Sequence, residues 1–364
     1  MEAHLEALCS GLQGLIEVQV IAANERSSTE EERIGGVPVS RLGTIVTLAS
    51  TPICPSMVFR IRAASADVVH IHLPNPAAVL AYLASRHPGR LVITYHSDVI
   101  RQKFLGAMFE PIVHAILERS AAIIATSANY LHSSHVLSRH VKKCRVIPFG
   151  IHPGDFERPD PDAILDLRER YGSRIVLGVG RLVYYKGFEY LVRAMTRVSG
   201  TLLLVGDGPL RPSLEKLAAS LGLHRRVIFC GEVYTQTLVA YYHAASLLVL
   251  SSIARSEAFG IVQLEAMACG KPIVNTSLDS GVPFVSLDGV TGFTVPPADP
   301  VALAGAIGRL LDNPGLCRQF GEAARLRVRN KFSVELMVRR VARLYHEVLG
   351  TIEENHADAR AVSA

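Results

Sequence analysis

The hydrophobic pattern of the chain alternates between two kinds of stretch. Short, continuous runs of apolar and β-branched residues are typical of strands in a parallel sheet, because helices cover both faces of such a sheet. Longer stretches carry apolar residues three or four positions apart, which is the pattern of an amphipathic helix. The short runs predict strands at Val18–Ala22, Val68–Leu73, Leu91–Tyr95, Ala122–Thr126, Arg145–Pro148, Ile175–Val179, Leu202–Gly206, Val227–Cys230, Leu247–Leu250 and Ile273–Asn275. The longer stretches predict helices such as Leu210–Leu221, Tyr234–Ala244, Ile261–Ala268, Val301–Leu311 and Ser333–Leu349.

This alternation of strands and helices predicts an α/β fold with two doubly wound, Rossmann-like domains. The alternation breaks around His152–Asp162, a stretch that is rich in proline, glycine and acidic residues. We therefore expect a first domain over residues 1–152, a second over 165–332, a C-terminal helix over 333–350 and a polar tail over 351–364. Two such halves face a cleft, and ligands bind at the carboxyl ends of parallel strands.

Composition narrows the class of protein. Of the 364 residues, 49% are hydrophobic and 20% are charged, as in folded globular chains. No run of about 18 residues is free of charges and turn formers, so we expect no transmembrane helix, and the first residues do not resemble a secretory signal. The six cysteines are scattered without CxxC pairs, which predicts reduced thiols in a cytoplasmic protein and no metal site. A net charge of +5, no tryptophan and no recognition motif give no support for nucleic-acid binding.

The first motif with chemical potential directly follows the strand Ile175–Val179. It contains Gly180, Arg181, Lys186 and Gly187. Glycines at the end of a strand let the backbone turn sharply near a ligand, and an arginine with a lysine can neutralise a diphosphate. The plainer alternative is a surface loop with two solvated cations. The motif is not a P-loop, because GxxxxGK[ST] is absent.

The second motif surrounds the start of the helix Ile261–Ala268. Glu257 precedes this helix, Gly260 stands at its beginning, and Glu265 lies within it. The free N–H groups of its first turn are suited to an anion. A carboxylate on a mostly apolar helix needs a partner, so Glu265 either serves a ligand or pairs with a structural cation such as a neighbouring arginine.

These two motifs belong to a set of short segments along nearly the whole chain. The segments are Gly180–Gly187, Val205–Pro209, Phe229–Val233, the Glu-x7-Glu element Glu257…Glu265, Gly281–Pro283, Gly289–Phe293 and Pro296–Asp299. In this order and in this strand–helix context, the chain resembles the retaining glycosyltransferases of the GT-B fold, in the large group-1 (family 4) class. The resemblance implies that the second domain binds a nucleotide-diphosphate sugar.

The same resemblance implies a role for each residue of the two motifs. Arg181 and Lys186, next to Gly180, hold the diphosphate. Glu257 contacts the donor sugar, together with the backbone amides of Phe259, Gly260 and Ile261, which also meet the distal phosphate. Glu265 accepts hydrogen bonds from the ribose hydroxyls. The base lies against Gly231, Glu232 and Val233.

The first domain contributes histidines and an aspartate to this expectation. By the resemblance, His96 at the end of the strand Leu91–Tyr95 faces the hydroxyls of the donor sugar, and Asp98 lies nearby on the acceptor side. Without the resemblance, His96 is better interpreted as a hydrogen-bonded histidine at a strand end. His70 and His72 share one face of a strand but lack a third metal ligand, so they are interpreted as structural or acceptor-side residues.

We expect the reaction to break the C1–O bond to the nucleotide through an oxocarbenium-like state, with the anomeric configuration retained. Because cations stabilise the departing diphosphate, neither a metal nor another cofactor is required. No residue is clearly marked as a nucleophile of the kind that retaining glycosidases use. The leading donors are GDP-mannose and UDP-hexoses.

The segment 99–119 bears on the acceptor. Apolar residues alternate there with Arg101 and Lys103, which suits a peripheral contact with an anionic membrane beside a lipid-linked acceptor. The apolar positions can equally pack on the sheet, with the cations in solvent. The expected location is therefore the cytoplasm, or the inner face of the membrane.

The beginning of the chain departs from the family pattern. Family members open with a strand and a Gly-rich loop, whereas this sequence begins at the helix that usually follows, around Glu2–Leu12. We therefore expect the first domain to lack that strand and loop.

The main prediction is a retaining hexosyltransferase that acts on a glycan or lipid-linked acceptor in cell-surface polysaccharide or glycolipid synthesis. The alternatives are an amino-terminally truncated, inactive nucleotide-binding relative and a nucleotide-sugar epimerase of the same fold.

Overall fold

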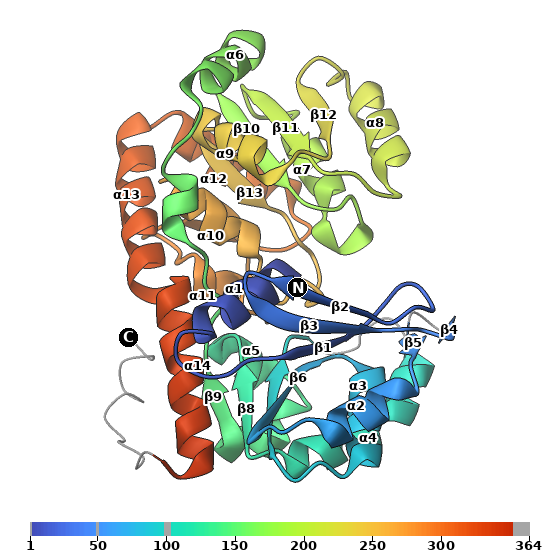
Figure 1. Ribbon diagram of the computed structural model, residues 1–364. Helices are drawn as coiled ribbons and strands as arrows, with labels where there is room; N and C mark the ends of the chain where they lie inside the picture. Colours follow the sequence, from blue (N-terminus) through green and yellow to red (C-terminus); the bar gives the residue numbers. More distant parts are fainter. Residues whose placement is uncertain (1, 49–50, 98–102, 352–364) are drawn as a thin grey trace. The chain divides into compact units, whose positions relative to one another are not determined.

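The computed structural model describes residues 2–48, 51–97 and 103–351. The chain divides into two compact units (Figure 1). The first unit comprises Met1–Gly150 together with Val334–Ala364, and the second comprises Ile151–Ser333. None of the helices among the described residues is both long enough and apolar enough to cross a membrane.

The second unit is built on a six-stranded, wholly parallel sheet with the order β12-β11-β10-β13-β14-β15. The chain leaves β10 for β11 on one side and later returns to β13 on the other side of β10. This reversal of direction is a topological switch point, where ligands commonly bind in such folds. The strands are β10 (Ile175–Val179), β11 (Thr201–Val205), β12 (Val227–Gly231), β13 (Leu247–Leu250), β14 (Ile273–Thr276) and β15 (Gly292–Val295).

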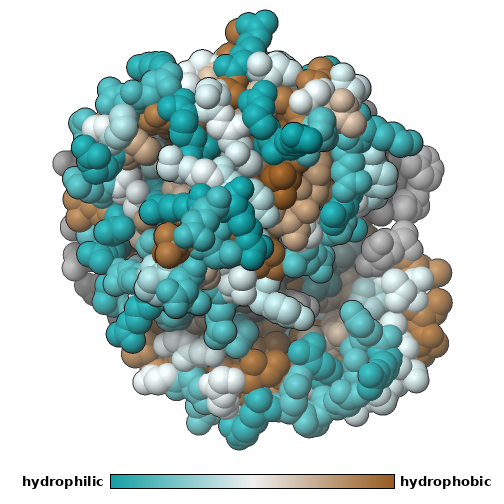
Figure 2. All heavy atoms as spheres, turned by 90° about the horizontal axis from the view of Figure 1, so that it is seen from above, coloured by the Kyte–Doolittle hydropathy of each residue, from teal (hydrophilic) through white to brown (hydrophobic). Residues whose placement is uncertain are grey.

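Helices pack around this sheet, so the central strands are buried on both faces. All five residues of β10 are buried, which explains why its sequence is a continuous apolar run. Hydrophilic side chains cover most of the face seen in Figure 2, with apolar residues in smaller groups. The helical segments are η2 (Pro153–Phe156), α6 (Pro161–Tyr171), η3 (Tyr184–Lys186), α7 (Phe188–Ala194), α8 (Arg211–Ser220), α9 (Thr235–Ala244), α10 (Ile261–Ala268), α11 (Val282–Val285), α12 (Pro300–Leu311) and α13 (Pro314–Lys331).

The described residues of the first unit form three separate small sheets. A four-stranded parallel sheet has the order β6-β7-β8-β9, a three-stranded sheet has the order β1-β3-β2, and β4 pairs with β5 in a hairpin. The strands are β1 (Val20–Ala23), β2 (Glu30–Ile34), β3 (Val37–Leu42), β4 (Val46–Leu48), β5 (Thr51–Ile53), β6 (Val68–Leu73), β7 (Arg90–Tyr95), β8 (Ala122–Ala125) and β9 (Cys144–Val146). The helical segments are α1 (Glu2–Leu12), α2 (Ser56–Ala63), α3 (Pro76–Ser85), α4 (Lys103–Arg119), α5 (Ala128–Ser133), η1 (Leu137–Lys143) and α14 (Val334–Leu349).

The C-terminal helix α14 packs within the first unit, although it follows the second unit in the chain (Figure 1). Leu8 and Leu12 of α1 share a buried cluster with Met337, Val338 and Val341 of α14. A Cβ atom at Gly11 would lie 2.5 Å from a methyl carbon of Val338, so glycine permits the close approach of the two helices.

The expected fold class is confirmed, since both units contain parallel strands with helices between them. The strands expected at Val68–Leu73, Ile175–Val179 and Leu247–Leu250 have the bounds of β6, β10 and β13. Strands β2, β3, β4, β5 and β15 were not predicted. Four of the five residues of β2 are exposed, so it lacks the apolar run that marks the predicted strands.

Candidate functional site

An ion pair joins the two sequence motifs of the second unit. The Lys186 ammonium lies 2.6 Å from Oε2 of Glu257, and the Ser252 hydroxyl donates a hydrogen bond of 3.0 Å to the same oxygen. Only 11% of the Lys186 side chain and 10% of the Glu257 side chain are exposed. Charged side chains are buried this deeply only when they are paired. A lysine ammonium has three N–H donors, so the donors of Lys186 that Glu257 does not use can still bind an anion.

Two glycines shape the loop that carries Lys186. Gly187 has a φ of +63°, and a Cβ atom there would lie 2.2 Å from the carbonyl oxygen of Ser251. Gly180 has a φ of +141°, and a Cβ atom there would lie 3.2 Å from the Lys186 ammonium nitrogen. Larger residues at either position would therefore displace the backbone or the lysine. Arg181, in the same loop, is exposed.

Glu265 on α10 is held by a tyrosine that our sequence analysis did not single out. The hydroxyl of Tyr242, on α9, donates a hydrogen bond of 2.5 Å to Oε2 of Glu265. Burial raises the pKa of Glu265, while the Tyr242 hydrogen bond and the Lys186 charge lower it. The expected structural alternative was a cation, such as a neighbouring arginine. The hydrogen bond comes from Tyr242, and the cation that acts on the carboxylate is Lys186. The adjacent pair Tyr241–Tyr242 carries no local signal that marks one of its members for this contact.

The start of α10 follows the same strand as Ser252 and Glu257. Gly260 caps this helix with a φ of +76°, and Phe259 before it is only 2% exposed. Ile261 begins the helix and is partly buried. The first N–H groups of a helix have no partner within the helix, so this turn offers donors and a positive dipole end to an anion.

Gly231 ends β12 with a φ of +72°. Its carbonyl oxygen accepts a hydrogen bond of 2.7 Å from the amide of Gly206, at the end of β11. Of the two residues after it, Glu232 is exposed and Val233 is partly buried. The ends of β11 and β12 therefore meet at one edge of the sheet. The loop after β10 lies at the same edge, because the Leu182 amide donates a hydrogen bond of 2.9 Å to the carbonyl oxygen of Asp207. The Lys186–Glu257 pair adds the segment after β13. This edge combines a cation, two carboxylates and helix-end amides, a set that suits a ligand with both phosphate and hydroxyl groups.

Three histidines of the first unit form a stack of aromatic rings. Nδ1 of His72 lies 2.8 Å from Nε2 of His96, while His70 lies 2.6 Å from the hydroxyl of Tyr345 and 2.7 Å from that of Thr94. The rings of His70, His72 and His96 stack in sequence. Burial lowers the pKa of His70 to about 3 and that of His96 to about 4, so both rings are neutral at pH 7.

His96 is only 7% exposed, and each of the three stacked histidines has a protein hydrogen-bond partner. Asp98 lies outside the described residues. The same holds for residues 99–102 of the segment expected to contact a membrane. The rest of that segment forms α4, where Ile116 and Leu117 are fully buried.

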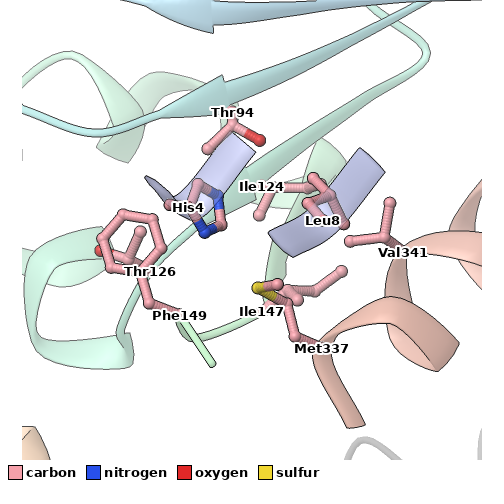
Figure 3. A pocket seen from close by; sticks show the side chains of 9 residues that line it. All are labelled: His4, Leu8, Thr94, Ile124, Thr126, Ile147, Phe149, Met337 and Val341. Carbon is pink, nitrogen blue, oxygen red and sulfur yellow. The ribbon is translucent and has the colours of Figure 1, made fainter. Parts of the chain in front are cut away.

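A small cavity lies beside this histidine stack in the first unit (Figure 3). Its lining is His4, Leu8, Thr94, Ile124, Thr126, Ile147, Phe149, Met337 and Val341. It has room for about one water molecule, so it cannot hold a sugar nucleotide. Among the described residues, no group of three or more histidine, cysteine, aspartate or glutamate side chains is arranged to hold a metal ion.

Comparison with known proteins agrees with this architecture. Residues 164–327 match the family model "Glycosyl transferases group 1", and residues 1–154 match "Glycosyltransferase Family 4". The chain is 37% identical over 301 residues to the D-rhamnosyltransferase WbpZ of Pseudomonas aeruginosa, covering 82% of this chain and 79% of that protein. It is 32% identical over 304 residues to the O-antigen chain mannosyltransferase C of Escherichia coli, covering 83% and 81%.

Among solved structures, the sucrose-phosphate synthase from Thermosynechococcus elongatus is similar, with a TM-score of 0.80 and 28% identity. The match covers 95% of this chain and 92% of that one. The family matches, the identity to these two relatives and the two units built on parallel sheets agree with one another. The chain therefore belongs to the group 1, family 4 glycosyltransferases and has their GT-B fold.

Proposed function

We propose that this protein is a retaining hexosyltransferase that transfers mannose from GDP-mannose to a glycan or lipid-linked acceptor in cell-surface polysaccharide synthesis. The name of one relative, an O-antigen chain mannosyltransferase, supports this sugar and this kind of product. The name of the other gives D-rhamnose, which is the 6-deoxy form of mannose. UDP-hexoses are the competing donors. The observation that carries the proposal is the buried pair of Lys186 and Glu257 at the switch point of the second unit's sheet.

Lys186 and Arg181 bind the diphosphate in this proposal. As the bond from C1 to the nucleotide breaks, negative charge grows on the departing phosphate, and fixed cations stabilise it without the need for a metal or another cofactor. The amides of Phe259, Gly260 and Ile261 contribute donors for the phosphate next to the sugar. The dipole of α10 favours an anion at that end.

Glu257 orients the donor sugar rather than attacking it. Its Oε2 is engaged by the Lys186 ammonium and the Ser252 hydroxyl, and both contacts make a carboxylate a weaker nucleophile. Glu265 accepts hydrogen bonds from the ribose hydroxyls, and Gly231, Glu232 and Val233 lie against the base. His96 contacts the hydroxyls of the donor sugar as a neutral imidazole.

The acceptor side is assigned to His70, His72 and Asp98, and a peripheral membrane contact to residues 99–119. The membrane contact would bring the protein to the inner face of a membrane, where lipid-linked acceptors are found. The basic residues Arg101 and Lys103 suit the negative charge of such a surface.

A donor panel tests the proposal. The purified protein is incubated with GDP-mannose, UDP-glucose, UDP-galactose and UDP-N-acetylglucosamine, and the released nucleotide is measured. We expect release from GDP-mannose, and a loss of roughly 10²- to 10³-fold in Lys186→Ala, because a preorganised charge that stabilises the departing phosphate is removed. Lys216→Ala, which changes an exposed lysine of α8, is the matched control and should retain the wild-type rate.

Undiminished release by Lys186→Ala would contradict the assigned role. Release from a UDP-hexose alone would keep the reaction and change the donor. Conversion of a donor into its epimer without transfer would support the epimerase alternative. If no donor releases nucleotide and neither GDP nor UDP binds, the transferase proposal fails. Binding of nucleotide without release would support the alternative of an inactive nucleotide-binding relative.

A further inference from the structure

The geometry points to Tyr242 as a positioning residue for the donor nucleotide. In this inference, which rests on the proposed function, the Tyr242 hydroxyl holds the Glu265 carboxylate by Oε2. Oε1 is thereby left to accept hydrogen bonds from the ribose hydroxyls. Tyr242 acts on the nucleotide only through Glu265.

The position of the Tyr242 hydroxyl is set by packing. The residue is fully buried on α9, and its ring meets the ring of Phe156 edge-on, with centroids 6.4 Å apart. Side chains in a close-packed interior sit in rotamer minima, so the hydroxyl of this fully buried ring has a defined position. That place is 2.5 Å from Glu265 Oε2. A glutamate on a different helix is thus tied to a rigid point of the unit.

The direction of the hydrogen bond follows from the protonation of the two groups. Burial and the nearby Glu265 charge raise the pKa of Tyr242 well above its usual value, so its hydroxyl keeps the proton and donates it. Glu265 as a residue is only partly buried, so a ligand at this edge of the sheet can reach part of it. An ionised carboxylate accepts on both oxygens, and fixing one of them orients the other. Without the tether the carboxylate would rotate about its side-chain bonds, and its contact with a diol would cost more entropy.

Two titratable groups act on the charge of Glu265, namely Tyr242 on α9 and Lys186 in η3. Cys269, just after α10, is in turn affected by the Glu265 charge, which raises the pKa of its thiol. The hydrogen bond and the lysine favour the carboxylate, whereas burial disfavours it. Removal of the Tyr242 hydroxyl therefore raises the pKa of Glu265 further. The carboxylate will then become protonated at a higher pH than in the wild-type protein.

The test compares two nucleotides that differ only in the ribose hydroxyls, GDP and 2′,3′-dideoxy-GDP, by calorimetry on the full chain. In Tyr242→Phe, which keeps the ring, we expect GDP binding to weaken roughly five- to twentyfold, in line with the loss of one hydrogen bond to a charged group. Binding of the dideoxy nucleotide should not change. Tyr190→Phe removes a hydroxyl from α7, outside this contact, and should bind both nucleotides like the wild type.

Two further readouts distinguish positioning from a merely structural role. As the pH is lowered, GDP binding by Tyr242→Phe should weaken at a higher pH than wild-type binding does. The dideoxy nucleotide, which carries the same phosphates, serves as the reference for this shift. In addition, Tyr242→Phe in a Glu265→Gln background should weaken GDP binding little beyond Glu265→Gln alone, because both changes remove one function.

The inference is overturned if Tyr242→Phe weakens both nucleotides equally, or if GDP binding stays at the wild-type level while Glu265→Gln weakens it. In these two cases the proposed function stands. A wild-type protein that binds UDP but not GDP is tested in the same way with UDP and 2′,3′-dideoxy-UDP. If the wild-type protein binds neither GDP nor UDP, the proposed donor site fails, and the inference on Tyr242 fails with it.

Discussion

The two units of the molecule bury titratable groups in opposite ways. In the first unit, His70, His72 and His96 stack on one another, and burial keeps them neutral. In the second unit, Lys186 and Glu257 are buried as an ion pair with a hydroxyl beside them. The difference follows from the partners. An imidazole can lose its charge at little cost near neutral pH, whereas a lysine and a glutamate retain theirs when each compensates the other.

The histidine stack makes the first unit sensitive to acid, and this is the largest effect we expect. An unfolded chain binds protons at an ordinary histidine pKa near 6.5, whereas the folded state holds the pKa of His70 at about 3 and that of His96 at about 4. Between these values the unfolded state binds more protons, so stability falls as the pH falls. From pH 7 to pH 5 each histidine should cost about 2 kcal/mol of unfolding free energy.

Hydrogen exchange, corrected for the intrinsic effect of pH, measures this loss strand by strand. We expect β6 and β7 to lose more protection at pH 5 than β10 and β13 of the second unit. Equal losses in the two units would show that the stacked histidines do not set the acid response of the first unit.

Breaking the ion pair tests the other side of the comparison. Glu257→Gln leaves the Lys186 ammonium buried without its counter-charge, so we expect the unfolding free energy to fall by about 3 kcal/mol. Urea denaturation measures this loss. The double variant Lys186→Met/Glu257→Gln removes both charges and should regain most of the stability. A double variant less stable than Glu257→Gln alone would contradict this account of the pair.

The smallest expected effect concerns the proposed membrane contact of the first unit. Replacing Arg101 and Lys103 with serine should weaken the free energy of binding to anionic vesicles by about 2 kcal/mol, since each cation near such a surface contributes about 1 kcal/mol. Sedimentation with the vesicles measures this binding. Sedimentation with neutral vesicles should not change. Replacing Arg225 and Lys216 of the second unit with serine removes the same amount of charge and serves as the matched control. A wild-type protein that does not bind anionic vesicles would remove this proposal.

Much of the second unit could be predicted from local pattern. The strands β10 and β13 are continuous apolar runs, and the glycines around Lys186 mark a sharp turn after a strand. Strand β2 of the first unit escaped prediction because its residues are mostly charged and exposed, and it pairs at the edge of a small sheet. Its pairing with β3 depends on a turn and a partner strand rather than on an apolar face.

The sequence by itself determined the alternation of strands and helices, the family resemblance and the importance assigned to Lys186, Glu257 and Glu265. These depend on short-range periodicity and on motifs a few residues long. The tertiary structure alone decided that Lys186 pairs with Glu257, that Tyr242 holds Glu265, and that α14 packs against α1 of the first unit. Such contacts join residues that are distant in the chain. They arise only once the strand order has brought particular loops and helices together, and no local pattern encodes that order.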